Sequence, residues 1–231
     1  LLVLPDAIPG MTAQNVAASM SGCAGQRCMA ASAMIGVGNV DAIIEKICEE
    51  ARKIVPGENL GAVINKASQE RIERFIGEAE RDGAKILVDG RNTKVAGKEN
   101  GTYVGPTVID YVKPTMSVAT EEIFGPVISI MRTNTVDEAL AIENANPYGN
   151  AASVFTQNGG MARYIIDKAS AGMIGVNVGV PVPREPFSFG GWNESKFGVG
   201  DITGKSSIEF WTKLKKSTVK WNAEAGVNWM S

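Results

Sequence analysis

Histidine is absent from this 231-residue sequence, and its absence excludes several kinds of enzyme. Serine–histidine–aspartate triads, cysteine–histidine proteases and zinc sites built on imidazole all need that side chain. Long apolar runs are also missing, because no uncharged stretch approaches the ~20 residues that cross a bilayer. Residues 1–10 include Asp6 and no basic residue, which does not match a secretory signal. The candidate nucleophiles that remain are thiols, hydroxyls and lysines.

Cysteine and net charge are both low. The three cysteines, Cys23, Cys28 and Cys48, cannot all pair, so we expect reduced thiols in the cytosol or the mitochondrial matrix. The pair Cys23 and Cys28 lacks further ligands nearby, so no metal site is predicted. With 23 basic and 25 acidic residues the net charge is −2, which argues against nucleic acid as a partner. No membrane partner is expected.

Short β-rich runs alternate with amphipathic helical stretches, and this alternation predicts an α/β fold. We expect strands at 1–4, 34–37, 85–88, 102–110, 127–132, 151–156 and 172–177. We expect helices from Thr12 to about Gly22, from Val40 to Ile54, from Ser68 to Gly83, from Thr135 to Asn144 and over 160–170. Thr12 and Ser68 are the predicted N-caps of their helices, and Thr135 with Glu138 forms a predicted capping box.

Three segments fall outside that alternation. Residues 146–149 (Asn-Pro-Tyr-Gly) predict a turn. Residues 178–206 are rich in glycine and proline, and a loop of that length in a domain is usually functional. Residues 208–221 alternate apolar and polar side chains, which predicts a strand able to join a neighbouring sheet.

Cys28 stands in the run Gly25-Gln26-Arg27-Cys28, between a helix of small residues and a strand. The glycine allows the backbone to approach a ligand closely. The guanidinium of Arg27 favours the thiolate over the thiol, and it can hold a carboxylate at two points. The alternative is a buried cysteine with a packing role, which is the role that we expect for Cys48.

Two other clusters are candidates for binding. In residues 121–126 two acidic residues, Glu121 and Glu122, stand just before a predicted strand, where a carboxylate could accept a hydrogen bond from a sugar hydroxyl. The alternative for this segment is a solvated loop. In residues 187–192 aromatic side chains flank paired glycines, so they could line a pocket or cover the core.

Six segments, taken in order, resemble the aldehyde dehydrogenase superfamily. They are GQRC (25–28), GPTV (105–108), EEIFGP (121–126), NPYGNAASVFT (146–156), G-x-x-x-V-N (172–177) and FGGWNES (189–195). The resemblance implies a catalytic domain over 1–206, with a largely parallel open sheet flanked by helices, and an oligomerisation strand and tail over 207–231. It also implies that the N-terminal cofactor-binding domain is absent. Leu1, which is not a methionine, fits a chain that begins inside a longer protein.

The resemblance also implies roles for particular residues. Cys28 would attack the aldehyde carbon, hydride would pass to NAD, and a thioester would remain on the sulfur. The backbone N–H of Cys28 would be one oxyanion donor. Glu122 would bind the nicotinamide ribose, Phe124 would pack near it, and Phe189 would line the substrate pocket. Asn177 and Pro106 would belong to the scaffold.

Within the superfamily the sequence most resembles the CoA-acylating branch that oxidises methylmalonate and malonate semialdehydes. Arg27 directly before the cysteine, the run 179–198, and Lys196 after Ser195 carry this likeness. It implies that Arg27 binds the substrate carboxylate, that decarboxylation follows, and that coenzyme A accepts the acyl group. It also implies a homodimer or homotetramer of the full-length protein.

Two alternatives stay open. A hydrolytic aldehyde dehydrogenase would release a free acid, but the glutamate base of such enzymes would precede Leu1. The chain could also be a catalytically silent folding and association unit. We expect little or no dehydrogenase activity from this chain alone, because most cofactor contacts would be missing.

Overall fold

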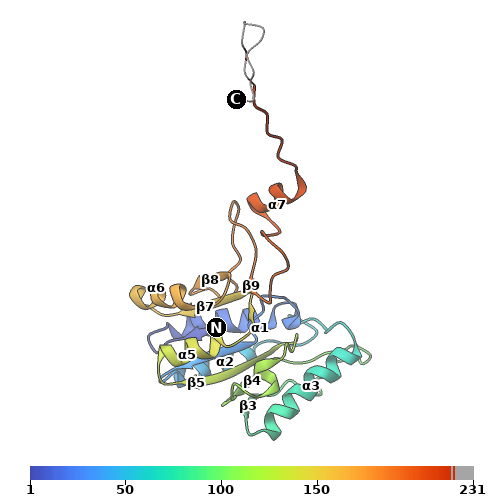
Figure 1. Cartoon of the computed structure of the whole chain (residues 1–231). Coiled ribbons are helices and arrows are strands. Elements are labelled where there is room, and N and C mark those ends of the chain that lie inside the picture. The colour runs from blue at the N-terminus through green and yellow to red at the C-terminus, as the bar shows by residue number, and fades with distance from the viewer. Residues whose placement is uncertain (220, 222–231) are drawn as a thin grey trace.

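The computed structural model describes residues 1–219 and 221, and it contains a seven-stranded sheet with helices on both faces (Figure 1). The strand order is β3-β4-β5-β2-β1-β7-β8, and every neighbouring pair is parallel except β3 with β4. This arrangement confirms the predicted α/β fold with a largely parallel sheet. The strands are β1 (Leu2–Val3), β2 (Ala33–Val37), β3 (Lys85–Val88), β4 (Thr107–Asp110), β5 (Val127–Thr133), β7 (Ala151–Phe155) and β8 (Met173–Val176).

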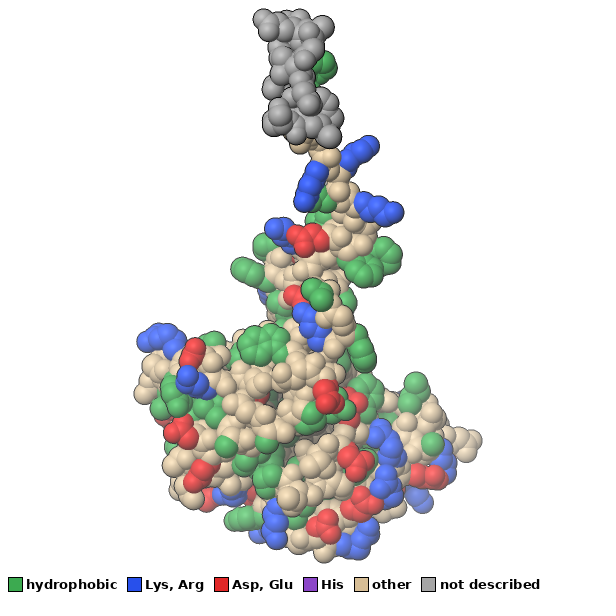
Figure 2. Space-filling view, viewed as in Figure 1, with side chains coloured by type: hydrophobic (Ala, Val, Ile, Leu, Met, Phe, Trp, Pro, Cys, Tyr) green, Lys and Arg blue, Asp and Glu red, His purple; other side chains and the backbone are tan. Residues whose placement is uncertain are grey.

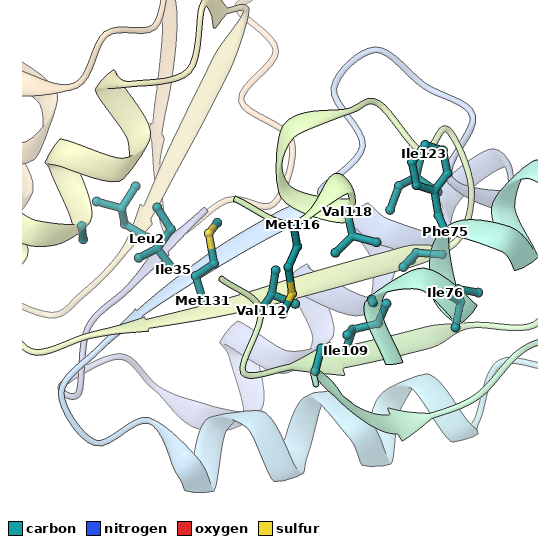
Figure 3. Close-up of a cluster of buried hydrophobic side chains, with 14 of the residues drawn as sticks. Leu2, Ile35, Phe75, Ile76, Ile109, Val112, Met116, Val118, Ile123 and Met131 are labelled. Carbon is teal, nitrogen blue, oxygen red and sulfur yellow. The ribbon is translucent and has the colours of Figure 1, made fainter. Parts of the chain in front are cut away.

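The helices divide between the two faces of the sheet. Apolar side chains of α1 and α2 form one buried cluster with the sheet, and those of α3, α5 and α6 belong to a second cluster. Figure 3 shows part of the second cluster, where Phe75 and Ile76 of α3 point toward Ile109 and Ile123. The helical segments are α1 (Pro9–Ser21), η1 (Gly22–Gly25), α2 (Asp41–Arg52), α3 (Lys66–Arg81), α4 (Ser117–Thr120), α5 (Val136–Asn144), α6 (Gly159–Lys168) and α7 (Gly204–Trp211).

The predicted helix starts were partly wrong. Helix α1 begins at Pro9 after Ile8, and Thr12 is a fully buried residue inside the helix. Proline suits the first helical position, because its missing N–H would have no intrahelical partner there. Asn65 caps α3 by accepting a hydrogen bond from the backbone N–H of Ser68, so Ser68 lies inside the helix. The capping box that begins α5 at Thr135 is confirmed.

Residues 146–149 and the C-terminal part of the chain differ most from their predictions. Tyr148–Gly149, predicted as part of a turn, forms the short strand β6, which pairs with β9 (Trp192–Asn193) from the long loop. Residues 208–211 of the predicted C-terminal strand end helix α7 instead, and residues 212–219 form no strand. A strand needs an open sheet edge beside it, and the projecting α7 has none (Figure 1). Residue 220 of that predicted strand lies outside the described residues.

Apolar side chains are exposed along the part of the chain that projects from the sheet. Figure 2 shows green side chains above the body of the protein, and no residue of α7 is buried. Phe197, Phe210 and Trp211 are 98%, 74% and 80% exposed. Exposed apolar surface of this extent is typical of a segment that packs against another protein surface. Every helix among the described residues is too short or too polar to cross a bilayer.

Strands β4 and β5 are joined by an ion pair between buried Asp110 and half-buried Arg132. Asp110 is 2% exposed, and Arg132 donates to both of its oxygens, from Nε at 3.0 Å and from Nη2 at 2.8 Å. Arg132 also donates from Nη1 to Asp41 at 2.6 Å, which connects α2 to the sheet. These hydrogen bonds, that to Asp110 first, raise the pKa of Arg132, so the guanidinium stays charged.

Replacing Arg132 with leucine is expected to lower the free energy of unfolding by about 3 kcal/mol, because it leaves the buried Asp110 carboxylate unpaired. Urea unfolding measures the change. Lys46→Ala is the control, since it removes only an exposed pair with Glu49 and should leave the unfolding midpoint unchanged. Equal midpoints for the two variants would contradict the stabilising role of Arg132.

Candidate active site

The loops that carry the candidate residues meet at one edge of the sheet. Residues 26–32 lead into β2, residues 121–126 lead into β5, and Asn150 directly precedes β7. These strands run in the same direction, so their amino ends lie together. Sites in open parallel sheets usually lie at the carboxyl ends. Here the cluster forms at the amino ends, because the sequence places its motifs before the strands.

Cys28 is exposed at the end of a tight reversal of the chain. After α1 the backbone turns through Cys23, Ala24 and Gly25, whose φ angles are 53°, 54° and 70°. Left-handed conformations are strained for the first two residues, and such strain is common at functional sites. The reversal carries Cys28 out of the helix direction and leaves its thiol accessible.

Gly25 brings the Cys28 turn against residues 121–126. A Cβ atom on Gly25 would overlap the carbonyl group of Gly125 and would lie 2.7 Å from the nitrogen of Pro126. The sequence predicted that Gly25 lets the backbone approach a ligand closely. In the structure, Gly25 instead lets the backbone approach Gly125 and Pro126 closely. The turn that carries Cys28 and the turn that carries Glu122 are therefore in direct contact.

Glu122 and Phe124 are both accessible on that second turn. The backbone carbonyl of Glu122 accepts a hydrogen bond from Arg71 at 2.8 Å, which holds the turn on α3, and its side chain is exposed. Phe124 adopts a φ of 55° and is 38% exposed, although its neighbour Ile123 is buried. An exposed carboxylate and an exposed aromatic ring thus lie on the turn that contacts the Cys28 segment.

Asn150 connects Cys28 to a pocket. Its side-chain Nδ2 donates to the carbonyl oxygen of Cys28 at 3.2 Å. The same side chain lines a pocket of about 200 Å³ together with half-buried Phe189, and Lys196 and Asp201 form an ion pair of 3.0 Å in its wall. Sequence reasoning missed Asn150, because nothing in its local pattern reveals a partner 122 residues away. A second pocket, beside the end of α2, contains none of the candidate residues.

Arg27 lies against helix α1. Its Nη2 donates to the carbonyl oxygens of Ala18 at 3.2 Å and Ser19 at 3.1 Å, in the last turn of that helix. Its Nε is buried and has no hydrogen-bond partner among the described residues. The guanidinium is therefore held on the end of α1, and its buried Nε makes no hydrogen bond to the described residues.

The three thiols differ in environment. Cys23 and Cys28 are exposed, whereas Cys48 is buried in the α1–α2 cluster, and burial raises the pKa of the Cys48 thiol. We expect iodoacetamide to alkylate Cys28 first and Cys48 last, which peptide mass spectrometry measures. Earlier modification of Cys23 or Cys48 would contradict the assignment of Cys28 as the nucleophile.

Asn177, expected in the scaffold, exchanges hydrogen bonds with the backbone of Thr156.

Comparison with known proteins identifies the family of this chain. Residues 1–217 match the aldehyde dehydrogenase family. The chain belongs to that family. A relative from Rattus norvegicus, "Methylmalonate-semialdehyde/malonate-semialdehyde dehydrogenase [acylating], mitochondrial", is 42% identical over 229 residues. The match covers 96% of this chain and 43% of the relative, so this aldehyde dehydrogenase chain spans less than half of the relative's length.

Solved structures of aldehyde dehydrogenases share the fold. The methylmalonate-semialdehyde dehydrogenase of Oceanimonas doudoroffii superposes with a TM-score of 0.93 at 38% identity, covering 96% of this chain and 47% of that one. An indole-3-acetaldehyde dehydrogenase of P. syringae, solved with NAD⁺, gives a TM-score of 0.86 at 29% identity over 95% of this chain and 45% of that one. The predicted family and the predicted fold are therefore confirmed.

Proposed function

We propose that this chain is the catalytic half of an NAD-dependent, CoA-acylating dehydrogenase of methylmalonate or malonate semialdehyde. The observation that supports the proposal is the position of Cys28. The thiol is exposed, its turn contacts residues 121–126 through Gly25, and its carbonyl is held by Asn150 at the edge of the Phe189 pocket. The names of the relatives support the substrate and the acyl acceptor.

Cys28 performs the covalent step in this proposal. Its thiolate attacks the aldehyde carbon, the carbonyl π electrons move to oxygen, and a thiohemiacetal forms. The backbone N–H of Cys28 is one donor to that oxygen. Bound NAD would supply the hydride acceptor, so that the carbon held on Cys28 would be oxidised from thiohemiacetal to thioester. The thiol of coenzyme A then attacks the thioester carbon, and the Cys28 thiolate leaves.

The residues present fit the nicotinamide end of the cofactor. The exposed carboxylate of Glu122 is a hydrogen-bond acceptor that suits ribose hydroxyls, and the exposed ring of Phe124 offers an apolar surface beside it. Arg27 suits a substrate that is both aldehyde and acid, because it directly precedes Cys28 and its guanidinium is held at the end of α1. Before acyl transfer, the carboxylate of the Cys28 thioester would leave as carbon dioxide. The electron pair of the broken C–C bond would form an enolate, which takes a proton from water.

We assign residues 1–206 to the catalytic domain and residues 207–231 to an association segment. The exposed aromatic side chains of α7 support an association role. The full-length protein would be a homodimer or homotetramer. It would work in a reducing compartment, either the cytosol or the mitochondrial matrix. The relative from Rattus norvegicus carries "mitochondrial" in its name.

The acyl-transfer half of the reaction is testable without NAD. The purified chain is mixed with p-nitrophenyl propionate, whose acyl group a thiolate accepts with release of p-nitrophenolate. We expect one propionyl group on Cys28 by mass spectrometry, and its transfer to added coenzyme A as propionyl-CoA. Release of propionate at a rate independent of coenzyme A would favour the hydrolytic alternative. Failure to acylate Cys28 would favour a catalytically silent unit.

The same chain is expected to reduce almost no NAD with an acid semialdehyde, because the cofactor contacts on this chain are confined to one turn. Absorbance of the reduced nicotinamide measures this. Turnover at an ordinary enzyme rate, about 1 s⁻¹ or faster, would overturn that expectation.

A further inference from the structure

Gly22, the first residue after helix α1, has a backbone that does not require glycine. Its φ is −55° and its ψ is 128°, which any residue adopts without strain. The missing side chain is needed for space instead. A Cβ atom at this position would overlap Nη2 and Cζ of Arg27 and would lie 2.8 Å from Nη1.

The guanidinium of Arg27 occupies that space because of what lies beyond it. Its Nη2 reaches the carbonyl oxygens of Ala18 and Ser19, which belong to the last turn of α1. The Ala18 carbonyl also accepts a hydrogen bond from the backbone N–H of Gly22. The carbonyl groups of a last helical turn form the negative end of the helix dipole. A cation is stabilised at this helix end. The space left by the missing side chain of Gly22 therefore holds the guanidinium of Arg27 in place, and Arg27 directly precedes Cys28.

We propose that Gly22 is a specificity-determining residue, which makes room for the Arg27 guanidinium and thereby sets the preference of Cys28 for anionic, carboxylate-bearing electrophiles over neutral ones. The inference rests on the proposed function, in which Cys28 is the nucleophile. Gly22 acts through Arg27 and touches neither substrate nor cofactor, so it is a positioning residue.

Two alkylating reagents test the preference on the chain as it is. In both, the Cys28 thiolate attacks the methylene carbon, the C–I bond breaks, iodide leaves, and the proton of the thiol passes to buffer. Iodoacetate carries a carboxylate and iodoacetamide is its neutral counterpart. The ratio of their second-order rates at Cys28, measured by peptide mass spectrometry, therefore reports the fixed positive charge and cancels changes in thiol accessibility.

Gly22→Ala is expected to lower this rate ratio by about threefold or more, because the displaced guanidinium no longer stands at a fixed distance from Cys28. Arg27→Gln should lower the ratio similarly. In the double variant Gly22→Ala/Arg27→Gln the ratio should equal that of Arg27→Gln alone, because the two changes remove one interaction. Gly10→Ala is the matched control, since a Cβ atom at Gly10 meets nothing within 4 Å.

The inference would be overturned if Gly22→Ala kept the wild-type ratio of iodoacetate to iodoacetamide rates. It would also be overturned if the double variant had a lower ratio than Arg27→Gln alone. If Gly22→Ala alone fails to fold, recovery of folding in the double variant would support the claim that Gly22 makes room for the Arg27 guanidinium. Failure of both variants to fold would overturn that claim. A wild-type chain whose Cys28 resists both reagents would instead contradict the proposed function.

Discussion

Replacing Cys28 with serine is expected to slow acylation by p-nitrophenyl propionate by about a thousandfold or more. A serine hydroxyl is not ionised near neutral pH, and it needs an adjacent general base to become a nucleophile. The sequence contains no histidine to supply that base. A stopped-flow measurement of the p-nitrophenolate burst gives the rate, and mass spectrometry shows whether residue 28 carries the acyl group.

Cys23→Ser is the matched control for that measurement. Cys23 is the other exposed thiol and lies in the same turn, so its loss should leave the burst rate within a factor of about two. A burst that persists in Cys28→Ser and disappears in Cys23→Ser would transfer the nucleophile to Cys23. Loss of the burst in both variants, with both proteins folded, would mean that the turn needs both thiols, which contradicts the proposed mechanism.

Replacing Gly25 with alanine is expected to lower the free energy of unfolding by about 4 kcal/mol, the sum of a left-handed backbone and an overlap that only backbone movement relieves. Gly25 has a φ of 70°, and the added Cβ would overlap the carbonyl of Gly125. The two turns must then separate, so we also expect acylation of Cys28 to slow by about tenfold.

Gly10→Ala is the control for the stability measurement. Gly10 lies in the first turn of α1 with open space around its Cβ position, and alanine is the better helix former there, so a small gain in stability is expected. A melting temperature for Gly25→Ala equal to that of the wild type would contradict the contact between the turns. A stable variant with slowed acylation would assign the contact to positioning alone.

Much of the fold followed from local patterns. The stripe of Ile43, Ile44 and Ile47 predicted α2, because apolar residues at helical spacing must bury one face. The capping box predicted the start of α5, since a cap depends on neighbouring residues. The motif around Cys28 and the motif around Glu122 were likewise visible as candidate site segments, although nothing in either showed that they touch.

The predictions failed where a residue's conformation depends on distant parts of the chain. The start of α1 was predicted at Thr12, which is a buried residue inside the helix. The alternation at 208–221 predicted a strand, but a strand forms only beside another strand, and residues 208–211 end a helix. Neither outcome follows from the local order of apolar and polar side chains.

Local sequence thus determined which residues could do chemistry: a thiol beside a cation is a candidate nucleophile that does not need a histidine base, and the chain has no histidine. Tertiary structure decided how they meet. The parallel strands β2, β5 and β7 place the three loops that precede them at one edge of the sheet. Gly25 allows the first two loops to contact each other, and Asn150 of the third donates a hydrogen bond to Cys28. It also placed the Arg27 guanidinium on the end of α1. The physical reason is that charge and reactivity belong to a residue's own atoms, whereas contacts depend on packing between segments far apart in sequence.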